Sequence, residues 1–194
     1  MTDLQNVKIL LILDIDETLI HATSKELDIP FDFMVFKYFV YIRPSLSTFL
    51  DYAFSNFNVA FWSSASDDYV FEIVKNIVKE EQKPAFVWGR SRCTPQRNDL
   101  TGNYDYYSDN GFSHYQYTKQ LKKIKRQRFT LEKALMVDDT PSKISNSYGN
   151  AIYIKEFNGE KEDSELIKLM EYLETLKNCQ NVRTIEKRMW NRLS

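Results

Sequence analysis

The chain has 194 residues, which is the size of one ordinary domain and too short for two full ones. Hydrophobic residues make up 43% of it and aromatic residues 14%, a composition that excludes a disordered chain. The 26 basic and 27 acidic residues nearly cancel, so no global field attracts nucleic acid or a membrane surface. We therefore expect residues 1–194 to form one domain with one site.

The first strong pattern along the chain is a set of short apolar runs that end in polar residues. These runs are Val7–Leu13, Phe57–Trp62 and Ala134–Val137, and each is predicted to be a strand buried on both faces. Helical patterns at Pro44–Phe54 and Ser66–Glu81 lie between them. Strands that alternate with helices predict an α/β fold with a central, mainly parallel sheet, and ligands bind at the carboxyl ends of such strands.

Two segments are predicted to extend from this framework beside the site. Phe31–Ile42 is aromatic and β-branched, and we expect a small β-hairpin flap there. Thr94–Tyr117 is polar, turn-rich and long for a connection within a compact domain, so it is predicted to be a variable loop. A functional loop and an aromatic surface loop are equally good interpretations of it. Neither segment has the length of a large cap domain.

The C-terminal part is predicted to cover the sheet and to complete a core of about residues 7–177. Ala151–Ile154 has the pattern of a short strand. Asp163–Lys177 carries leucine and isoleucine at helical spacing, and Val182–Leu193 is also expected to be helical.

The cysteines and the N-terminal sequence bear on the compartment. Cys93 and Cys179 lie far apart without metal-ligand spacing, so neither a disulfide framework nor a zinc site is expected. The apolar stretch near the N-terminus is too short to span a membrane and is soon interrupted by acids. These features predict an intracellular, cytoplasmic protein without a membrane partner, and they leave the oligomeric state open.

Four aspartates dominate the polar strand ends. Asp14 and Asp16 directly follow the first strand, and two carboxylates this close at a strand end concentrate negative charge. Asp138 and Asp139 end another strand and are expected at the same edge, where four acids without a cation would repel one another. Helix caps or a turn before Thr140 are the structural alternatives. Hard oxygen ligands of this kind favour magnesium.

Serines and lysines supply candidates for binding phosphate. Ser63 and Ser64 end the second strand, where a hydroxyl and backbone amides hold phosphate oxygens well, although these serines also suit the start of a helix. The run Lys119–Arg128 is either a solvated helix face or a positive region near an anionic substrate. Spacing alone does not choose among its lysines: Lys119, Lys122, Lys123 and Lys125.

Five motifs occur in an order that resembles a known superfamily: DIDETLIH, IRP, FWSSAS, YTKQLKKI and LMVDDTPSK. From about Val7 to Phe157 the chain is similar to the haloacid-dehalogenase (HAD) phosphatases, and within them to the FCP/SCP-like, or NLI-interacting-factor-like, group. The resemblance implies a Rossmann-like three-layer α/β/α fold. It also implies Mg²⁺-dependent hydrolysis of phosphomonoesters through an aspartyl-phosphate, on phosphoserine or phosphothreonine segments of proteins.

The same resemblance implies roles for the acids. Asp14 becomes the nucleophile, and Asp16 becomes the general acid and base. The metal ligands are Asp14, Asp139 and Asp16, the last through its backbone carbonyl. Asp138 orients Lys119, which helps to hold the phosphoryl group.

The resemblance also assigns the remaining site residues. Ser63 holds the phosphoryl group and stands where the family often has threonine. Ser64, Thr18 and Arg43 are expected on the substrate side, while Thr18 also shapes the turn after the nucleophile. Arg43 has an equally good structural interpretation. The final Asp-Asp pair departs from the Asp-Asn of many eukaryotic members. Because of such departures, the identity of the substrate is the property least safely inferred from the resemblance.

Other functions stay open at this point. A small-molecule, nucleotide or polynucleotide-end phosphatase is mildly favoured by the basic run, although nucleic acid is the less favoured partner. A noncatalytic binding module derived from the family is the third alternative, and the retained acids argue against it. His21 and His114 receive no role. A cluster of tyrosines forms either a gate or surface packing: Tyr104, Tyr106, Tyr107, Tyr115 and Tyr117.

Overall fold

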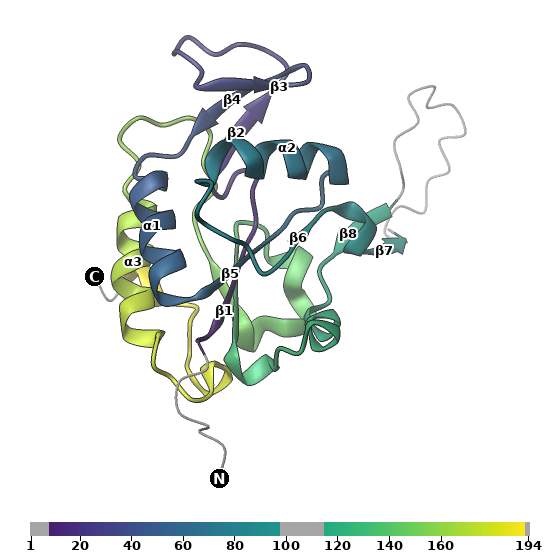
Figure 1. Ribbon diagram of the computed structural model, residues 1–194, viewed down its shortest axis with the longest axis vertical. Coiled ribbons are helices and arrows are strands. Elements are labelled where there is room, and N and C mark those ends of the chain that lie inside the picture. Colours follow the sequence, from purple (N-terminus) through teal and green to yellow (C-terminus); the bar gives the residue numbers. More distant parts are fainter. Residues whose placement is uncertain (1–7, 98–114, 193–194) are drawn as a thin grey trace.

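The central sheet of the computed structural model is parallel throughout and has the strand order β10-β9-β1-β5-β6 (Figure 1). The structure describes residues 8–97 and 115–192. The strands of this sheet are β1 (Leu10–Leu13), β5 (Asn58–Trp62), β6 (Val87–Trp88), β9 (Ala134–Asp138) and β10 (Ala151–Tyr153). The prediction of a mainly parallel α/β sheet is therefore confirmed.

The register brings the ends of three strands to one edge. Leu13 is the partner of Phe61 on β5 and of Val137 on β9. The next backbone amide, that of Asp14, still donates to the carbonyl of Val137 at 3.0 Å. The polar residues that follow β1, β5 and β9 consequently start from the same level of the sheet.

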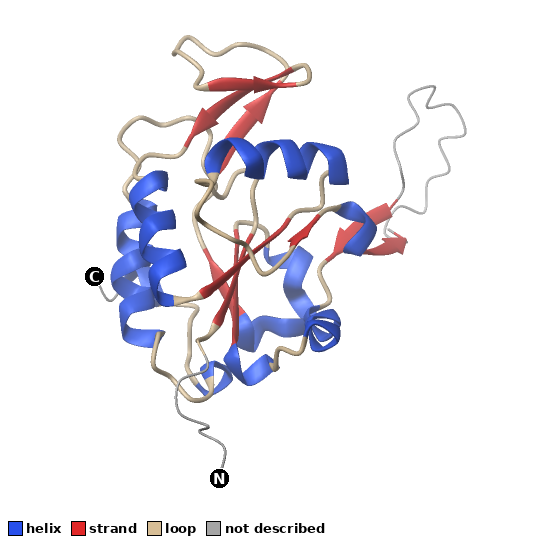
Figure 2. Ribbon diagram, viewed as in Figure 1, coloured by secondary structure: helices blue, strands red, loops and turns tan. Residues whose placement is uncertain are grey.

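Alternate residues of the strands face two different layers. Leu11 and Leu13 pack with the α-helices α1 (Leu46–Asn56), α2 (Asp67–Ile77) and α3 (Glu165–Leu176). Leu10 and Ile12 face the opposite side. That side is covered by 3₁₀ segments: η2 (Leu121–Gln127), η3 (Leu131–Lys133) and η4 (Pro141–Asn150). Figure 2 shows helical segments on both sides of the strands, which gives the three expected layers.

The flap is larger than the predicted hairpin. β3 (Phe33–Val35) and β4 (Tyr38–Ile42) form the hairpin, with Phe36 in the left-handed region at φ 54° between them. β2 (Ile20–Thr23) then adds to β4, so the flap is a three-stranded antiparallel sheet in the order β2-β4-β3. Figure 1 shows it beyond α2, at the end of the molecule toward which β1 runs.

The segment predicted as one long loop is paired at its two ends. After η1 (Arg90–Arg92), β7 (Thr94–Arg97) pairs antiparallel with β8 (Tyr115–Thr118). The expectations for Tyr104, Tyr106, Tyr107 and His114 fall outside the described residues.

Several predicted boundaries were wrong for local reasons. α1 begins at Leu46 rather than Pro44 because Ser45 adopts a left-handed φ of 67°. α2 ends at Ile77 rather than Glu81 because Val78 is already extended. In the described part of the expected helix over Val182–Leu193, which ends at residue 192, the chain forms two short 3₁₀ turns instead, η5 (Val182–Thr184) and η6 (Trp190–Arg192).

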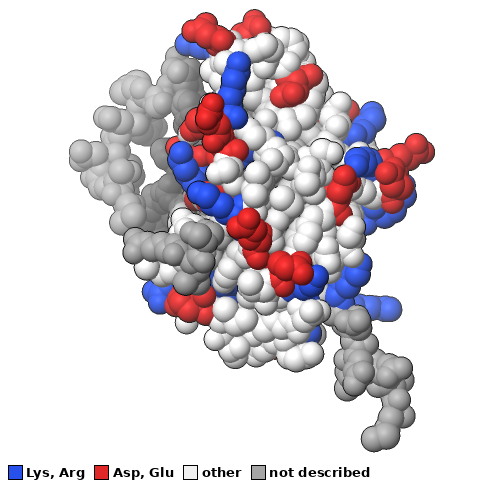
Figure 3. All heavy atoms as spheres, turned by 90° about the vertical axis from the view of Figure 1, so that its left-hand side faces the viewer, with Lys and Arg blue, Asp and Glu red and all other residues white. Residues whose placement is uncertain are grey.

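Three global features of the sequence have counterparts in the structure: hydropathy, cysteines and charge distribution. Within residues 8–97 and 115–192, no helix has the length and hydropathy needed to cross a membrane. Cys93 and Cys179 are free, as expected. On the face that Figure 3 shows, acidic and basic side chains are interspersed, which agrees with the balanced composition.

Candidate active site

The turn after β1 places two acids side by side. Asp14 is only 1% exposed. The chain then folds back, because the amides of Thr18 and Leu19 both donate to the carbonyl of Ile15, at 3.2 and 2.8 Å. Glu17 completes this turn in the left-handed region at φ 57°. This tight turn keeps Asp16 at the strand end beside Asp14.

Asp14 lies between two lysines. Nζ of Lys119 is 2.8 Å from Oδ1 of Asp14, and Nζ of Lys143 is 3.3 Å from Oδ2. Burial alone would raise the pKa of Asp14, but the two ammonium groups outweigh it and hold the pKa below its usual value. The carboxylate is thus kept anionic, as a nucleophile requires.

Lys119 is a buried bridge between two carboxylates. Its Nζ also donates to Oδ2 of Asp138 at 2.7 Å, and its side chain is completely enclosed. Asp138 in turn accepts from the backbone amide of Thr140 at 2.9 Å. This pair of contacts selects Lys119 from the lysines of the basic run, whereas Lys122 and Lys125 are exposed.

Asp16 has a different environment from Asp14. Its carboxylate accepts a hydrogen bond from the Tyr69 hydroxyl at 2.7 Å and another from Oγ of Ser63 at 3.1 Å. Burial raises the pKa of Asp16 and the charge of Asp14 raises it further, while the two hydroxyls act in the opposite direction. A raised pKa favours the protonated carboxyl, which is the form that a general acid needs.

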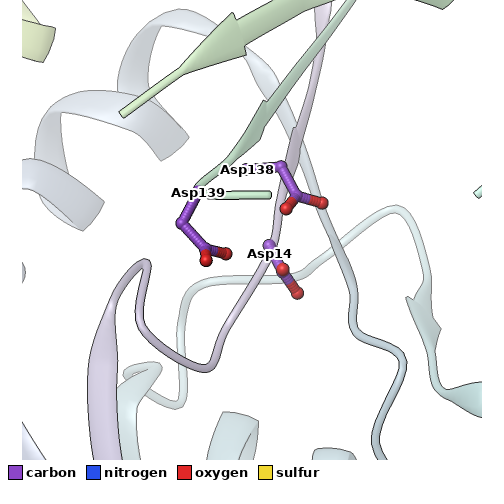
Figure 4. A group of neighbouring side chains, drawn as sticks. All are labelled: Asp14, Asp138 and Asp139. Carbon is purple, nitrogen blue, oxygen red and sulfur yellow. The ribbon is translucent and has the colours of Figure 1, made fainter. Parts of the chain in front are cut away.

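Three carboxylates from two strand ends form a group that suits a hard cation. Oxygens of Asp14, Asp138 and Asp139 lie within 4.8 Å of one another, and Figure 4 shows the side chains converging from the ends of β1 and β9. Asp139 accepts from Oγ1 of Thr140 at 2.8 Å. Clustered carboxylate oxygens are the donors that Mg²⁺ prefers, so the residues present fit that ion.

The two serines after β5 differ in position. Ser63 is 2% exposed, its amide donates to the carbonyl of Trp88 at 3.0 Å, and its Oγ accepts from the amide of Ala65 at 3.0 Å. Its hydroxyl therefore lies within the site, against Asp16. Ser64 is half-buried, and its carbonyl accepts from Nε of Arg90 at 2.9 Å.

Arg43 and Thr18 are enclosed rather than open to a ligand. The guanidinium of Arg43 pairs with Asp163 through Nε and Nη2, both at 2.8 Å, and donates to the carbonyls of Thr18 and Lys155 at 2.9 Å. Oγ1 of Thr18 is 3.5 Å from Oδ1 of Asp139. Because each of the three guanidinium nitrogens of Arg43 donates to a group inside the protein, the geometry favours its structural interpretation.

Sequence reasoning missed two residues that contact the aspartates. Tyr69 reaches Asp16 from the first turn of α2, and nothing in its surrounding residues distinguishes it from an ordinary core aromatic. Lys143 lies four residues after Asp139 within the LMVDDTPSK motif, and that spacing was its only signal. His21, which received no role, contacts Glu17 at 3.4 Å.

Comparisons with known proteins identify the family to which the chain belongs. The model of the NLI interacting factor-like phosphatase family matches residues 9–183. The CTD phosphatase-like protein 355R of Invertebrate iridescent virus 3 is 29% identical, over 89% of this chain and 98% of that protein. The CTD small phosphatase-like protein 2 of Dictyostelium discoideum is 26% identical over 91% of this chain, which spans only 29% of that longer protein.

A solved structure supports the fold independently of sequence. Fcp1, an essential RNA polymerase II CTD phosphatase, superposes with a TM-score of 0.54 over 96% of this chain and 60% of its own, at 14% identity. The family match covers most of the chain and includes both aspartate pairs of the site. The chain therefore belongs to the NLI interacting factor-like phosphatases, the FCP/SCP-like group of the HAD superfamily, and it is a phosphatase.

Proposed function

We propose that the enzyme hydrolyses phosphomonoesters through a phosphoaspartate formed on Asp14. The observation that carries this proposal is the contrast between two adjacent acids. The pKa of Asp14 is held low by the ammonium groups, while burial raises the pKa of Asp16. Two neighbouring carboxyl groups with opposite shifts are suited to be a nucleophile and a general acid.

The chemistry proceeds in two displacements. An Asp14 oxygen attacks phosphorus, the bond from phosphorus to the leaving oxygen breaks, and Asp16 gives that oxygen its proton. Asp16 then takes a proton from water, which attacks phosphorus and releases phosphate from Asp14. Ser63 and Tyr69 hold Asp16 in place through both steps.

Positive charge at the site offsets the charge of the phosphoryl group. Lys119 is fixed by Asp138 next to Asp14, so its ammonium group is already placed before substrate binds. We assign Mg²⁺ to Asp14, Asp139 and the backbone carbonyl of Asp16. When bound, Mg²⁺ supplies further neutralisation of the phosphoryl oxygens.

We infer that the substrate is a phosphoserine or phosphothreonine segment of a protein. The relatives named above are CTD phosphatase-like proteins. A groove of about 510 Å³ also lies between the flap and α2, on the helix that carries Tyr69. Apolar side chains border this groove and are largely exposed: Met34, Phe36 and Phe71. Such a surface suits an extended peptide better than a small ester.

The first test compares wild type with Asp14→Asn on p-nitrophenyl phosphate, with Mg²⁺ and with EDTA. We expect Mg²⁺-dependent turnover by wild type and none by the variant, whereas Asp16→Asn should accumulate phosphoenzyme detectable by intact mass. Equal turnover by wild type and Asp14→Asn would show that another residue is the nucleophile.

The second test separates the substrate classes. Phosphoserine and phosphothreonine peptides are compared with nucleotides and 5′-phosphorylated oligonucleotides at matched concentrations. We expect higher kcat/KM for the peptides. A polynucleotide-end phosphatase is the second candidate because Lys122, Lys125 and Arg126 expose positive charge on η2, next to Lys119. A folded, Mg²⁺-loaded protein inactive on every ester would instead be a binding module.

We place the enzyme inside the cell. Both cysteines are free thiols, and Cys93 is buried beside the site with Sγ 3.7 Å from the carbonyl of Ser63. Two free cysteines without a disulfide framework are typical of proteins in a reducing compartment. A fluorescent fusion localised by microscopy tests this assignment.

A further inference from the structure

Lys143 occupies the same place that the proposed metal requires. Its Nζ lies 3.3 Å from Oδ2 of Asp14 and 3.8 Å from Oδ1 of Asp139. Those two carboxylates are the side chains that we assign to Mg²⁺. An ion bound to both would lie about 2.1 Å from an oxygen of each, which is within strong repulsion of an ammonium group held between them.

The two lysines of the site contact different carboxylate oxygens of Asp14. Lys119 takes Oδ1 and shares Asp138, whereas Lys143 takes Oδ2 and shares Asp139. Each ammonium group therefore neutralises one side of a group of three carboxylates. Lys143 lies between Asp14 and Asp139, which is where the metal is expected.

Of the two lysines, Lys143 is the one able to leave. Its contacts, at 3.3 and 3.8 Å, are longer than the 2.8 and 2.7 Å contacts of Lys119. Its side chain is 20% exposed, while that of Lys119 is fully enclosed. The backbone of Lys143 is fixed, because its amide donates to Thr140 and its carbonyl accepts from Lys119. Only the side chain has to move.

We propose that Lys143 is an internal cation that competes with Mg²⁺ for the position between Asp14 and Asp139. Loading of the metal then requires the Lys143 side chain to swing toward solvent. This inference rests on the proposed metal site. It gives Lys143 two measurable effects: the ammonium group stabilises the metal-free site by offsetting the repulsion between the carboxylates of Asp14 and Asp139, and it weakens the affinity for the metal.

The test measures Mg²⁺ binding by calorimetry, without substrate, for wild type and Lys143→Met. The matched control is Lys168→Met, which removes the same charge from an exposed position on α3. We expect Lys143→Met to bind Mg²⁺ at least about fivefold more tightly than wild type and the control, as typical couplings between sites predict. Unchanged or weaker binding by Lys143→Met would overturn the proposal.

Two further measurements use the same proteins. In EDTA, Lys143→Met should unfold at a lower temperature than wild type and Lys168→Met, and Mg²⁺ should remove that difference. In wild type, amine labelling followed by mass spectrometry should show Lys143 becoming more reactive when Mg²⁺ is added, with Lys168 unchanged. This arm needs no variant to fold, and constant labelling of Lys143 contradicts the proposal.

These outcomes separate this inference from the proposed reaction. Tighter Mg²⁺ binding by Lys143→Met without hydrolysis of any ester leaves the competition intact and refutes the phosphatase mechanism. Hydrolysis with equal Mg²⁺ affinity in all three proteins does the reverse. If none of the proteins binds Mg²⁺, both the metal assignment and the competition are wrong.

Discussion

Replacing Lys119 by methionine should strongly destabilise the fold. Methionine keeps much of the length of the side chain but removes the ammonium group that contacts Asp14 at 2.8 Å and Asp138 at 2.7 Å. Removing one partner of a buried ion pair costs about 3–5 kcal/mol, because the other charge is left buried without compensation. Lys143 still contacts Asp14, so Asp138 carries most of this loss.

The pH dependence of this loss follows from Asp138. Burial and the charge of Asp14 raise the pKa of Asp138 to about 7, while Lys119 acts in the opposite direction. Without Lys119 that pKa rises further above its value in the unfolded chain. The protonated carboxyl is tolerated in the folded state, and stability is lost as the pH rises through the folded pKa. The deficit of Lys119→Met should therefore be largest above pH 7 and shrink in acid.

Urea unfolding at a series of pH values measures the deficit, with exposed Lys122 replaced by methionine as the matched control. The double variant Lys119→Met/Asp138→Asn should recover at least about half of the loss, since it removes both charges. An exposed ion pair contributes up to about 1 kcal/mol. If Lys119→Met lowers the free energy of unfolding by less than this above pH 7, the contacts of Lys119 with Asp14 and Asp138 do not act as a buried ion pair that stabilises the fold. Failure of Asp138→Asn to rescue would refute the assignment of the loss to Asp138.

Three further predictions concern other parts of the site. Tyr69→Phe removes a hydrogen bond that lowers the pKa of Asp16, so Asp16 should stay protonated to higher pH. The alkaline limb of the pH profile of kcat for a phosphopeptide should therefore shift up by about one pH unit. An unchanged limb would contradict the role of Asp16 as general acid. Arg43→Met breaks the buried pair with Asp163 and should cost about 3–5 kcal/mol in urea unfolding, whereas a substrate-binding role alone would change KM and leave stability intact. Phe36→Ser, at a side chain that is 65% exposed beside the groove, should raise KM for a phosphopeptide by about tenfold without changing KM for p-nitrophenyl phosphate, and equal effects on both would argue against a peptide groove.

The sheet was predictable because burial on both faces is encoded locally. Leu10–Leu13 and Ala134–Val137 are continuous apolar runs that stop at acids, and a parallel arrangement brings those acids to one edge. β6 has only two residues, so it carries too little pattern to be placed. β2, with the sequence IHAT, is a strand only because β4 lies beside it, and that pairing is a tertiary contact.

Site residues were predictable where a motif gives both the residue type and its position at a strand end. They were not predictable where a contact joins residues that are far apart in the sequence. Asp14 follows β1 and Asp138 ends β9, and because these strands are neighbours in the sheet, the proximity of the two acids follows from topology. The partner of Arg43 lies 120 residues away, and no local pattern connects Arg43 with Asp163. The spacing of the lysines did not distinguish Lys119 from those after it, so the family resemblance alone assigned it, and the structure now places it directly after β8 in contact with Asp138.

The β7–β8 ladder sets how this chain can change in length. Thr94 is paired with Thr118, so the ladder ends next to Lys119. Lys123 adds a second tie, because its Nζ donates to the carbonyls of Arg92 and Cys93. The position of Lys119 is thus fixed by contacts at the end of the ladder formed by Thr94 and Thr118, and not by the chain that connects β7 to β8. Insertions or deletions between β7 and β8 can therefore accumulate in related chains without moving the catalytic residues. This connection is where diverging members of the family can acquire new recognition sequences.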